Sequence, residues 1–145
     1  MIDFKPIDES NFQQIIDIKM PEGHHFVAPN IYSLAQAWVH RDIAHPFAIY
    51  NDDGELVGFI MLNIEKESRE AGIWRLMIAL EHQSKGYGTD AVARAVDYVK
   101  SLDGFDEMCL RTEPENQVAI HVYRKFGFEE TGEMDGNETI MRLRL

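Results

Sequence analysis

The sequence has little cysteine, the residue that forms disulfide scaffolds and many structural zinc sites. Its one cysteine, Cys109, has no partner for an intramolecular disulfide and no companion at zinc-binding spacing, so neither a disulfide scaffold nor a metal site is expected. Apolar runs such as LMIAL at 76–80 fall far short of the roughly 20 residues that a membrane span needs. The N-terminal stretch MIDFKPIDES lacks the charged and apolar regions of a signal peptide. These absences predict a cytoplasmic protein.

Positive charge is also scarce, with 14 lysines and arginines against 25 aspartates and glutamates and a formal net charge of −11. A strongly acidic chain repels nucleic-acid backbones and anionic membranes, so neither is an expected partner. A small cationic molecule or a peptide is the more natural ligand. Residues 71–102 are an exception, because their net charge is +1 and an anion would meet no net like charge there.

The composition is that of one globular domain over residues 1–145. Hydrophobic residues make up 45% of the chain and charged residues 27%, and no internal repeat or Pro/Gly/Ser-rich linker divides it. Helical periodicity predicts helices after Asp8-Glu9-Ser10 and at 31–40, 88–104 and 116–126. Apolar runs predict strands at 2–7, 46–50, 56–64, 72–80 and 108–111, then a hairpin over 128–145. We therefore expect an α+β fold, a mostly antiparallel sheet of about seven strands crossed by about four helices.

Some local patterns are specific enough to be compared with a structure. Asp53-Gly54 and Asp135-Gly136 lie between strand-like runs and predict tight hairpin turns. Residues 20–29 contain two prolines and a glycine and predict a loop. In the helix at 31–40, we expect four apolar residues to share one face: Ile31, Leu34, Ala35 and Trp38.

The segment from Leu76 to Thr89 combines a buried strand, a loop with two glycines and the start of a helix. Gly86 and Gly88 allow a tight turn and remove side chains that would keep a ligand away. The free amides of the first helical turn, with the helix dipole behind them, then form a site for a phosphate or pyrophosphate. The same glycines are also expected in a purely structural turn. No Gly-Lys-Ser/Thr follows them, which argues against a nucleotide-phosphate protein.

A second segment lies about 28 residues further along. Asn116 is placed to cap a helix, and Gly127 is placed to end it before the next strand. Taken alone, Tyr123 is expected to be a packed core tyrosine with its hydroxyl at the rim. It shares one helix face with Ala119, Ile120 and Phe126.

Together the two segments resemble the GNAT superfamily of N-acetyltransferases over most of the chain. The superfamily's central motif, L-x-V-x-P-x-x-Q-x-x-G-x-G, is matched in register, with Leu80 where proline is usual; the matching residues are Leu76, Ile78, Gln83, Gly86 and Gly88. Its downstream motif, N-x-x-A-I-x-x-Y-x-x-x-G-F, is matched at Asn116, Ala119, Ile120, Tyr123, Gly127 and Phe128. The resemblance is weaker in residues 1–50, which usually shape the acceptor site.

The resemblance implies the GNAT fold, with acetyl-CoA as cosubstrate. The backbone of Leu76, Met77 and Ile78 would pair with the pantetheine arm like an added strand, and the amides from Ser84 to Thr89 would hold the pyrophosphate. Lys85 either adds charge to this site or is a solvated loop lysine. The cofactor-binding residues implied are Leu76, Met77, Ile78, Gln83, Ser84, Lys85, Gly86, Tyr87, Gly88, Thr89 and Asn116.

By family position, Tyr123 is the general acid that protonates the departing thiolate, a role that suits a phenol with an ordinary pKa of roughly 10. Related polyamine acetyltransferases often carry an acidic residue two positions before the leucine of the central strand, where this chain has Trp74. No base is therefore assigned. The weak substitutes are Glu70, Glu81, Glu113, His24, His25 and His121.

The C-terminal stretch from Gly132 to Leu145 and the acidic composition resemble bacterial enzymes that acetylate spermine, spermidine or related diamines. The expected reaction is therefore direct transfer of an acetyl group to a primary amine, most simply a polyamine. The alternatives are a peptide N-terminus, an amino acid or an aminoglycoside as acceptor, or a domain that senses acetyl-CoA without catalysis. GNAT domains often dimerise, so the resemblance also allows a homodimer. Cys109 is expected to be a buried small hydrophobe and not an acyl-carrying nucleophile.

Overall fold

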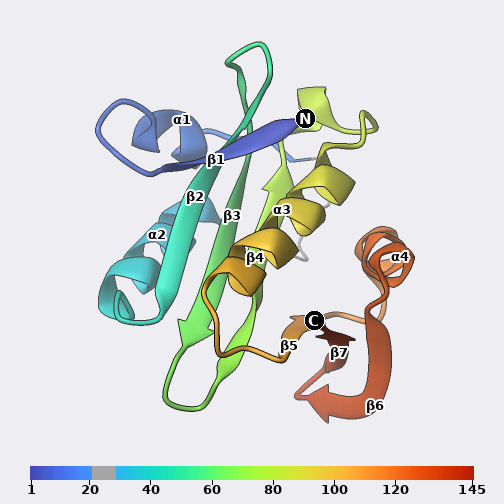
Figure 1. Ribbon diagram of the computed structural model, residues 1–145. Coiled ribbons are helices and arrows are strands. Elements are labelled where there is room, and N and C mark those ends of the chain that lie inside the picture. The colour runs from blue at the N-terminus through green and yellow to red at the C-terminus, as the bar shows by residue number, and fades with distance from the viewer. Residues whose placement is uncertain (21–28) are drawn as a thin grey trace.

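The computed structural model describes residues 1–20 and 29–145, and within them seven strands form one mixed sheet (Figure 1). The strands follow the order β1-β2-β3-β4-β5-β7-β6. All neighbours are antiparallel except β4 and β5, which are parallel and are connected through α3. The strands are β1 (Ile2–Pro6), β2 (Ala44–Asn51), β3 (Leu56–Glu65), β4 (Glu70–Ile78), β5 (Glu107–Thr112), β6 (Glu129–Asp135) and β7 (Glu138–Arg144).

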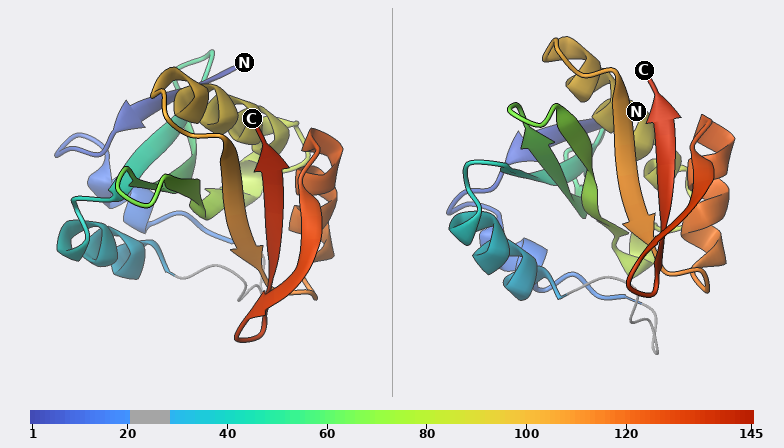
Figure 2. Two further views of the ribbon diagram at one scale, coloured as in Figure 1. Left: turned by 60° about the horizontal axis from the view of Figure 1, so that its bottom comes forward. Right: turned by 90° about the horizontal axis from the view of Figure 1, so that it is seen from below.

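Helices cover both faces of the sheet. In the described residues these are α1 (Phe12–Ile16), α2 (Asn30–Val39), α3 (Tyr87–Ser101) and α4 (Gln117–Phe126), with a short 3-10 turn, η1 (Leu80–His82). α3 and α4 pack on one face, and α1 and α2 pack on the other (Figure 2). None of these helices is long and apolar enough to cross a membrane. The predicted α+β fold is confirmed.

The hairpins form where the sequence predicts them. Gly54 and Gly136 both have positive φ, +76° and +61°, which a glycine adopts without strain. The side chain of Asn51 supports the first turn, because its Oδ1 accepts hydrogen bonds from the amides of Asp53 and Glu55, each at 3.0 Å. The predicted loop at 20–29 lies mostly outside the described residues, and so do His24 and His25.

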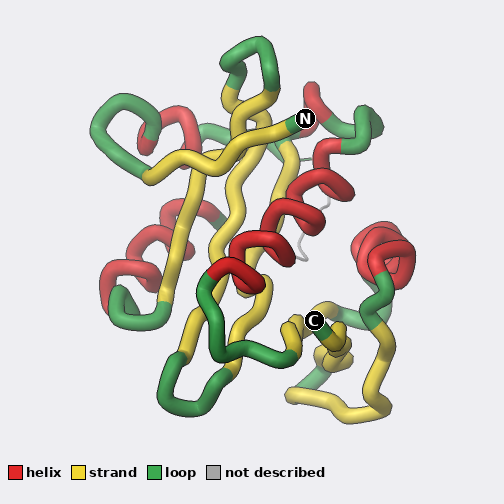
Figure 3. The backbone as a smooth tube through the Cα atoms, viewed as in Figure 1, coloured by secondary structure: helices red, strands yellow, loops and turns green. Residues whose placement is uncertain are grey.

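The two helices on the chemistry-bearing segments also agree with the periodicity. α3 buries a stripe against the sheet, as expected for its spacing: Ala91, Val92, Ala95, Val96 and Val99. α4 begins after Asn116, whose Oδ1 accepts a hydrogen bond from the amide of Ala119 at 3.4 Å, and it ends at Gly127 with φ +106°. Figure 3 shows the turn and loop that lead from β4 into α3.

The predicted face of α2 is correct at Leu34, which packs against the α1/α2 core, and wrong at Ile31, Ala35 and Trp38. Ile31 and Trp38 are 62% and 69% exposed, and the buried residues are Asn30, Ser33 and Ala37. The small side chain of Ala37 packs in the core on this face of the sheet. The side-chain amide of Asn30 also donates a hydrogen bond to the Ile15 carbonyl at 2.8 Å, which fixes the rotation of α2 against α1.

Two features of β4 shape the centre of the molecule. Leu62 of β3 pairs with Ile73 and Met61 pairs with Arg75, so Trp74 is an extra residue that forms a β-bulge. Beside it, Gly72 allows close approach of β5, because a Cβ on Gly72 would lie 1.9 Å from the Cys109 carbonyl oxygen. β4 and β5 pair at Gly72 and Ile73 and not beyond, within the described residues. The two strands therefore separate just after the bulge.

Candidate active site

The separation of β4 from β5 leaves one edge of residues 74–78 without a strand partner in the part of the chain that the structure describes. A cavity of about 460 Å³ lies along this edge, and we call it the loop cavity. It extends from the end of β4 over the loop after η1 to the first turn of α3, with α4 as its other wall. Its lining is Met20, Leu76, Met77, Ile78, His82, Gln83, Ser84, Gly86, Tyr87, Gly88, Thr89, Asn116, Val118, Ala119, Val122 and Tyr123.

The start of α3 presents unpaired main-chain amides to this cavity. Gly86 is the N-cap with φ +87°, and no side chain caps the helix. The amide of Asp90 donates to the Gly86 carbonyl at 3.0 Å, whereas the amides from Ser84 to Thr89 find no main-chain acceptor among the described residues. Such amides at a helix N-terminus form a binding site for an anion.

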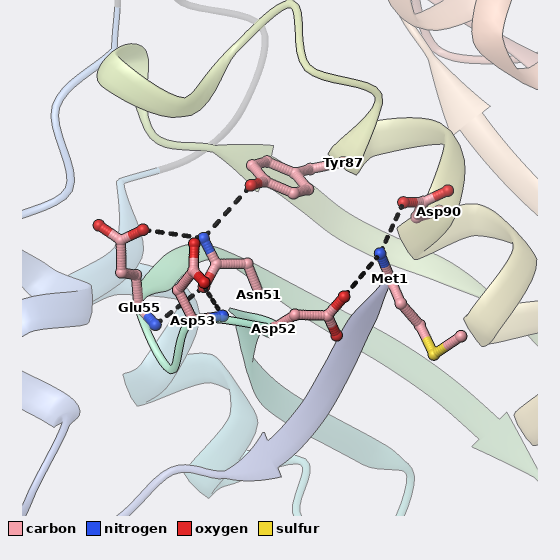
Figure 4. A network of polar contacts seen from close by, with 7 residues as sticks. All are labelled: Met1, Asn51, Asp52, Asp53, Glu55, Tyr87 and Asp90. Carbon is pink, nitrogen blue, oxygen red and sulfur yellow. Dashed lines mark hydrogen bonds and ion pairs between the residues drawn. The ribbon is translucent and has the colours of Figure 1, made fainter.

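The first turn of α3 is held by contacts with the β2–β3 hairpin (Figure 4). The side-chain amide of Asn51 donates hydrogen bonds to the Tyr87 hydroxyl at 3.2 Å and to Glu55 at 3.0 Å. The N-terminal ammonium of Met1 lies 3.9 Å from Asp90 on the same turn. These contacts fix the direction in which the free amides of α3 point.

Gly88 leaves space in the wall of the loop cavity. A Cβ at this position would meet no atom nearer than Ile78 Cγ1, at 4.0 Å. Packing within the described protein therefore does not require a glycine here. Its missing side chain instead leaves room for a ligand close to the backbone.

Tyr123 of α4 lies where the loop cavity meets a second cavity of about 310 Å³, which we call the inner cavity. Its side chain is buried, with 8% exposure, and its ring packs edge-on against Phe128. Burial raises the pKa of Tyr123 to about 12, so the phenol keeps its proton across the neutral range. In the described residues the Tyr123 hydroxyl has no hydrogen-bond partner. Leu76, Asn116 and Ala119 line both cavities as well.

A third cavity of about 410 Å³, the outer cavity, adjoins the inner one on the α2 side of the sheet. Glu138 and Arg75 line both the inner and the outer cavity. Glu113 faces the inner cavity, and Glu65 faces the outer one. The pKa of Glu65 is raised, first by burial and then by the neighbouring Glu70. The two cavities thus carry more carboxylates than cations, and a basic ligand is favoured.

The structure brings together nearly all the residues predicted from the sequence. Every predicted cofactor-binding residue lines the loop cavity except Lys85, which is exposed and does not line it. The exposure of Lys85 agrees with the expectation of a solvated loop lysine, and its role as a cofactor-binding residue stays a prediction. Sequence reasoning missed several wall residues, which carry no motif signal: Met20, His82, Val118 and Val122.

Among the candidates for a base, Glu113 lines the inner cavity, which Tyr123 also lines. Glu70, Glu81 and His121 line none of the three cavities. Cys109 is half-buried rather than buried, and its Sγ lies 3.5 Å from Arg142 Nε, so its treatment as a plain hydrophobe is corrected. It lines the outer cavity only, away from Tyr123.

Comparison with known proteins agrees with this arrangement. The acetyltransferase (GNAT) family model matches residues 12–128. The chain is similar to spermidine N(1)-acetyltransferase of Vibrio cholerae serotype O1, with 27% identity over 96 residues, 66% of this chain and 56% of the relative. It is also similar to spermidine N(1)-acetyltransferase of Escherichia coli K12, with 34% identity over 82 residues, 57% of this chain and 44% of the relative. The chain thus matches about half the length of these two relatives.

The fold is also found among solved structures. Spermidine N-acetyltransferase from Vibrio cholerae, solved in complex with CoA and spermine, aligns with a TM-score of 0.71. The alignment covers 99% of this chain and 95% of that one, at 21% sequence identity. At this identity the likeness shows the shared fold.

Proposed function

Because the chain belongs to the acetyltransferase (GNAT) family, we propose that it transfers the acetyl group of acetyl-CoA to a primary amine. The observation that carries the proposal is the position of Tyr123, which lines both the loop cavity and the inner cavity. A donor in the first cavity and an acceptor in the second would meet beside its hydroxyl. Both reactants would then be held in line for attack.

The loop cavity suits the two ends of acetyl-CoA. The free edge at Leu76, Met77 and Ile78 offers main-chain groups to the amides of an extended pantetheine arm. The unpaired amides from Ser84 to Thr89 offer donors to the pyrophosphate. Gly88 lets the ligand approach the helix backbone. An anion is tolerated here even in a chain with a net charge of −11, because residues 71–102 carry +1.

The reaction needs few groups from the protein because a thioester is already activated. The amine nitrogen attacks the carbonyl carbon, the C–N bond forms, and the C–S bond breaks. A main-chain amide of Met77 or Ile78 would stabilise the oxyanion. The amine loses a proton and the thiolate gains one, so the products are the acetamide and free CoA thiol.

Tyr123 would act on the departing sulfur as a hydrogen-bond donor. With a pKa of about 12 its hydroxyl stays protonated near neutral pH, but it is a weaker acid than a thiol of pKa about 8.5. It therefore donates a hydrogen bond to the developing thiolate, and a proton released by the amine completes the transfer. An alkylammonium of pKa about 10.4 must first lose a proton, and Glu113 of the inner cavity wall would accept it.

The acceptor class that we propose is the aliphatic amines that carry a second ammonium group, with the diamines and polyamines as its simplest members. Two of the relatives are spermidine acetyltransferases. The carboxylates of Glu65, Glu113 and Glu138 would raise the local concentration of such a cation. A second candidate, an amine that also carries a carboxylate, is favoured by Arg75 in the same wall.

The test is thiol release from acetyl-CoA in the presence of spermidine, spermine, a free peptide N-terminus and an aminoglycoside, at neutral and alkaline pH. We expect release that depends on the amine and is faster with spermidine and spermine than with the peptide N-terminus or the aminoglycoside. The control without amine measures simple hydrolysis. Thermal stabilisation by acetyl-CoA without release for any amine would contradict catalysis and favour a sensor of acetyl-CoA.

A further inference from the structure

Arg75 carries a positive charge into the otherwise acidic cavities on the α2 side. It lies on β4 just after the Trp74 bulge and lines both the inner and the outer cavity. Its side chain is half-buried. The other arginine of these walls, Arg111, is paired with Asp135 at 2.6 Å. Arg75 forms no ion pair with any described residue.

The guanidinium of Arg75 is nevertheless held in a fixed position. One terminal nitrogen donates to the Trp74 carbonyl and the other to Gln36 Oε1 of α2, each at 3.0 Å. The group also lies 5.9 Å from the centre of the Trp74 ring. Its Nε is buried and has no partner among the described residues. A fixed guanidinium with donors to spare suits a carboxylate, which accepts two parallel hydrogen bonds.

The bulge explains why the arginine is there. Side chains normally alternate between the two faces of a strand, but the extra residue resets this alternation. As a result, Trp74 and Arg75 both lie on the α2 side, with Trp74 packed against the α1/α2 core and Arg75 bonded to Gln36. A cation without an ionic partner at this depth loses hydration energy that a bound anion would restore.

Glu138 is the carboxylate of the wall that acts on the charge of Arg75. It lies close enough to raise the pKa of Arg75 against the larger lowering effect of burial, but too far away to form an ion pair. Arg75 and Glu138 line the same two cavities, whereas Tyr123 lines only the inner one of the two. A head group bound at Arg75 and Glu138 therefore sits further from α4 than the nitrogen that reacts.

We infer that the acceptor of this chain is an aliphatic amine that carries a carboxylate, and that Arg75 binds this carboxylate. The inference rests on the proposed acetyl transfer and narrows its acceptor to a diamino acid. The α-carboxylate pairs with Arg75, and the α-ammonium lies near Glu138. Each charge of the zwitterionic head group thus meets an opposite charge of the cavity wall. The side-chain amine then extends to Tyr123 and is the nitrogen that becomes acetylated.

The experiment compares acceptors that differ by one carboxylate: ornithine with putrescine, and lysine with cadaverine. Initial rates of CoA thiol release give kcat and KM for each, and the position of the acetyl group is read from the product by NMR. We expect kcat/KM at least about tenfold higher for each diamino acid, the size of one charge-assisted hydrogen bond, with the acetyl group on the side-chain nitrogen.

Arg75→Gln removes the charge, and Arg144→Gln, an exposed arginine at the end of β7 that lines none of the cavities, is the matched control. We expect Arg75→Gln to raise KM for ornithine about tenfold to a hundredfold and not to raise KM for putrescine, and Arg144→Gln to change neither KM. The wild-type preference tests the inference even if Arg75→Gln does not fold.

The possible failures are distinguishable. Equal or faster transfer to putrescine and cadaverine by the wild type, or acetylation of the α-nitrogen, would overturn the inference and leave the acetyl transfer intact. An unchanged ornithine KM in a folded Arg75→Gln protein would overturn it as well. Absence of transfer to every amine would overturn the proposed function, and this inference with it.

Discussion

The side-chain amide of Gln83 donates a hydrogen bond to the main-chain carbonyl of Ile78 at 3.0 Å. Ile78 is the last residue of β4, and Gln83 lies in the loop that leads to α3. The bond closes this loop on the strand, so the free edge and the free amides of the loop cavity keep one relative position. A ligand that contacts both then loses little entropy to ordering the protein.

Gln83→Ala should therefore weaken acetyl-CoA binding about fivefold, the effect of losing one ordinary hydrogen bond. Isothermal titration measures the change. Gln13→Ala is the control, because Gln13 is exposed on α1 and bonds to Asp17, the C-cap residue of that helix. Equal affinities for the two variants would contradict a role for the Gln83 bond in ordering the loop.

Gly88→Ala should separate ligand binding from folding. The added methyl meets nothing closer than 4.0 Å in the protein, and alanine is the better helix former by about 1 kcal/mol. We expect an unchanged or raised melting temperature in the absence of ligand, with acetyl-CoA affinity reduced about tenfold because the methyl fills ligand space. A variant that binds acetyl-CoA normally would show that the ligand does not approach this turn.

Gly72→Ala, unlike Gly88→Ala, should destabilise the fold. Its methyl would lie 1.9 Å from the Cys109 carbonyl oxygen, and a backbone atom cannot move aside without separating β4 from β5. We expect a loss of about 1–3 kcal/mol in the free energy of unfolding, measured by urea denaturation. Gly88→Ala serves as the comparison, and equal stability of the two variants would argue against the close approach at Gly72.

Burial of Tyr123 predicts a loss of stability at high pH. Its pKa is about 12 in the folded chain and about 10 when unfolded, so the unfolded state releases the proton first as the pH rises. This contribution to the free energy of unfolding is fully present below about pH 10. Between about pH 10 and pH 12 the free energy of unfolding falls by about 3 kcal/mol. Urea unfolding at several alkaline pH values should show a flatter decline for Tyr123→Phe. The exposed Tyr32→Phe should decline like the wild type.

The sequence predicts the elements whose signals are local. The spacing of apolar residues from Ala91 to Val99 is enough to identify α3 and its buried face, and Asn116 and Gly127 mark the ends of α4. Gly86 and Gly88 likewise mark the start of α3. These signals depend on backbone conformation and periodicity, which neighbouring residues determine.

Other features depend on tertiary contacts and escaped prediction. The face of α2 is decided by the bond from Asn30 to Ile15 and by small residues that fit the sheet, not by the large apolar side chains of Ile31 and Trp38. The bulge at Trp74 arises from pairing with β3, so the position of Arg75 in the cavities on the α2 side is invisible in the sequence of β4 alone. The sequence likewise leaves the position of the Lys85 side chain open, and in the fold this side chain is exposed and does not line the loop cavity.

The central claim is that donor and acceptor meet at the hydroxyl of Tyr123. Its most direct test is kcat of Tyr123→Phe, measured by thiol release with the best amine, together with the acetyl-CoA dissociation constant of the same protein. The account predicts a fall in kcat of about a hundredfold or more, with acetyl-CoA affinity within about twofold of the wild type. An unchanged kcat in the folded variant would contradict it.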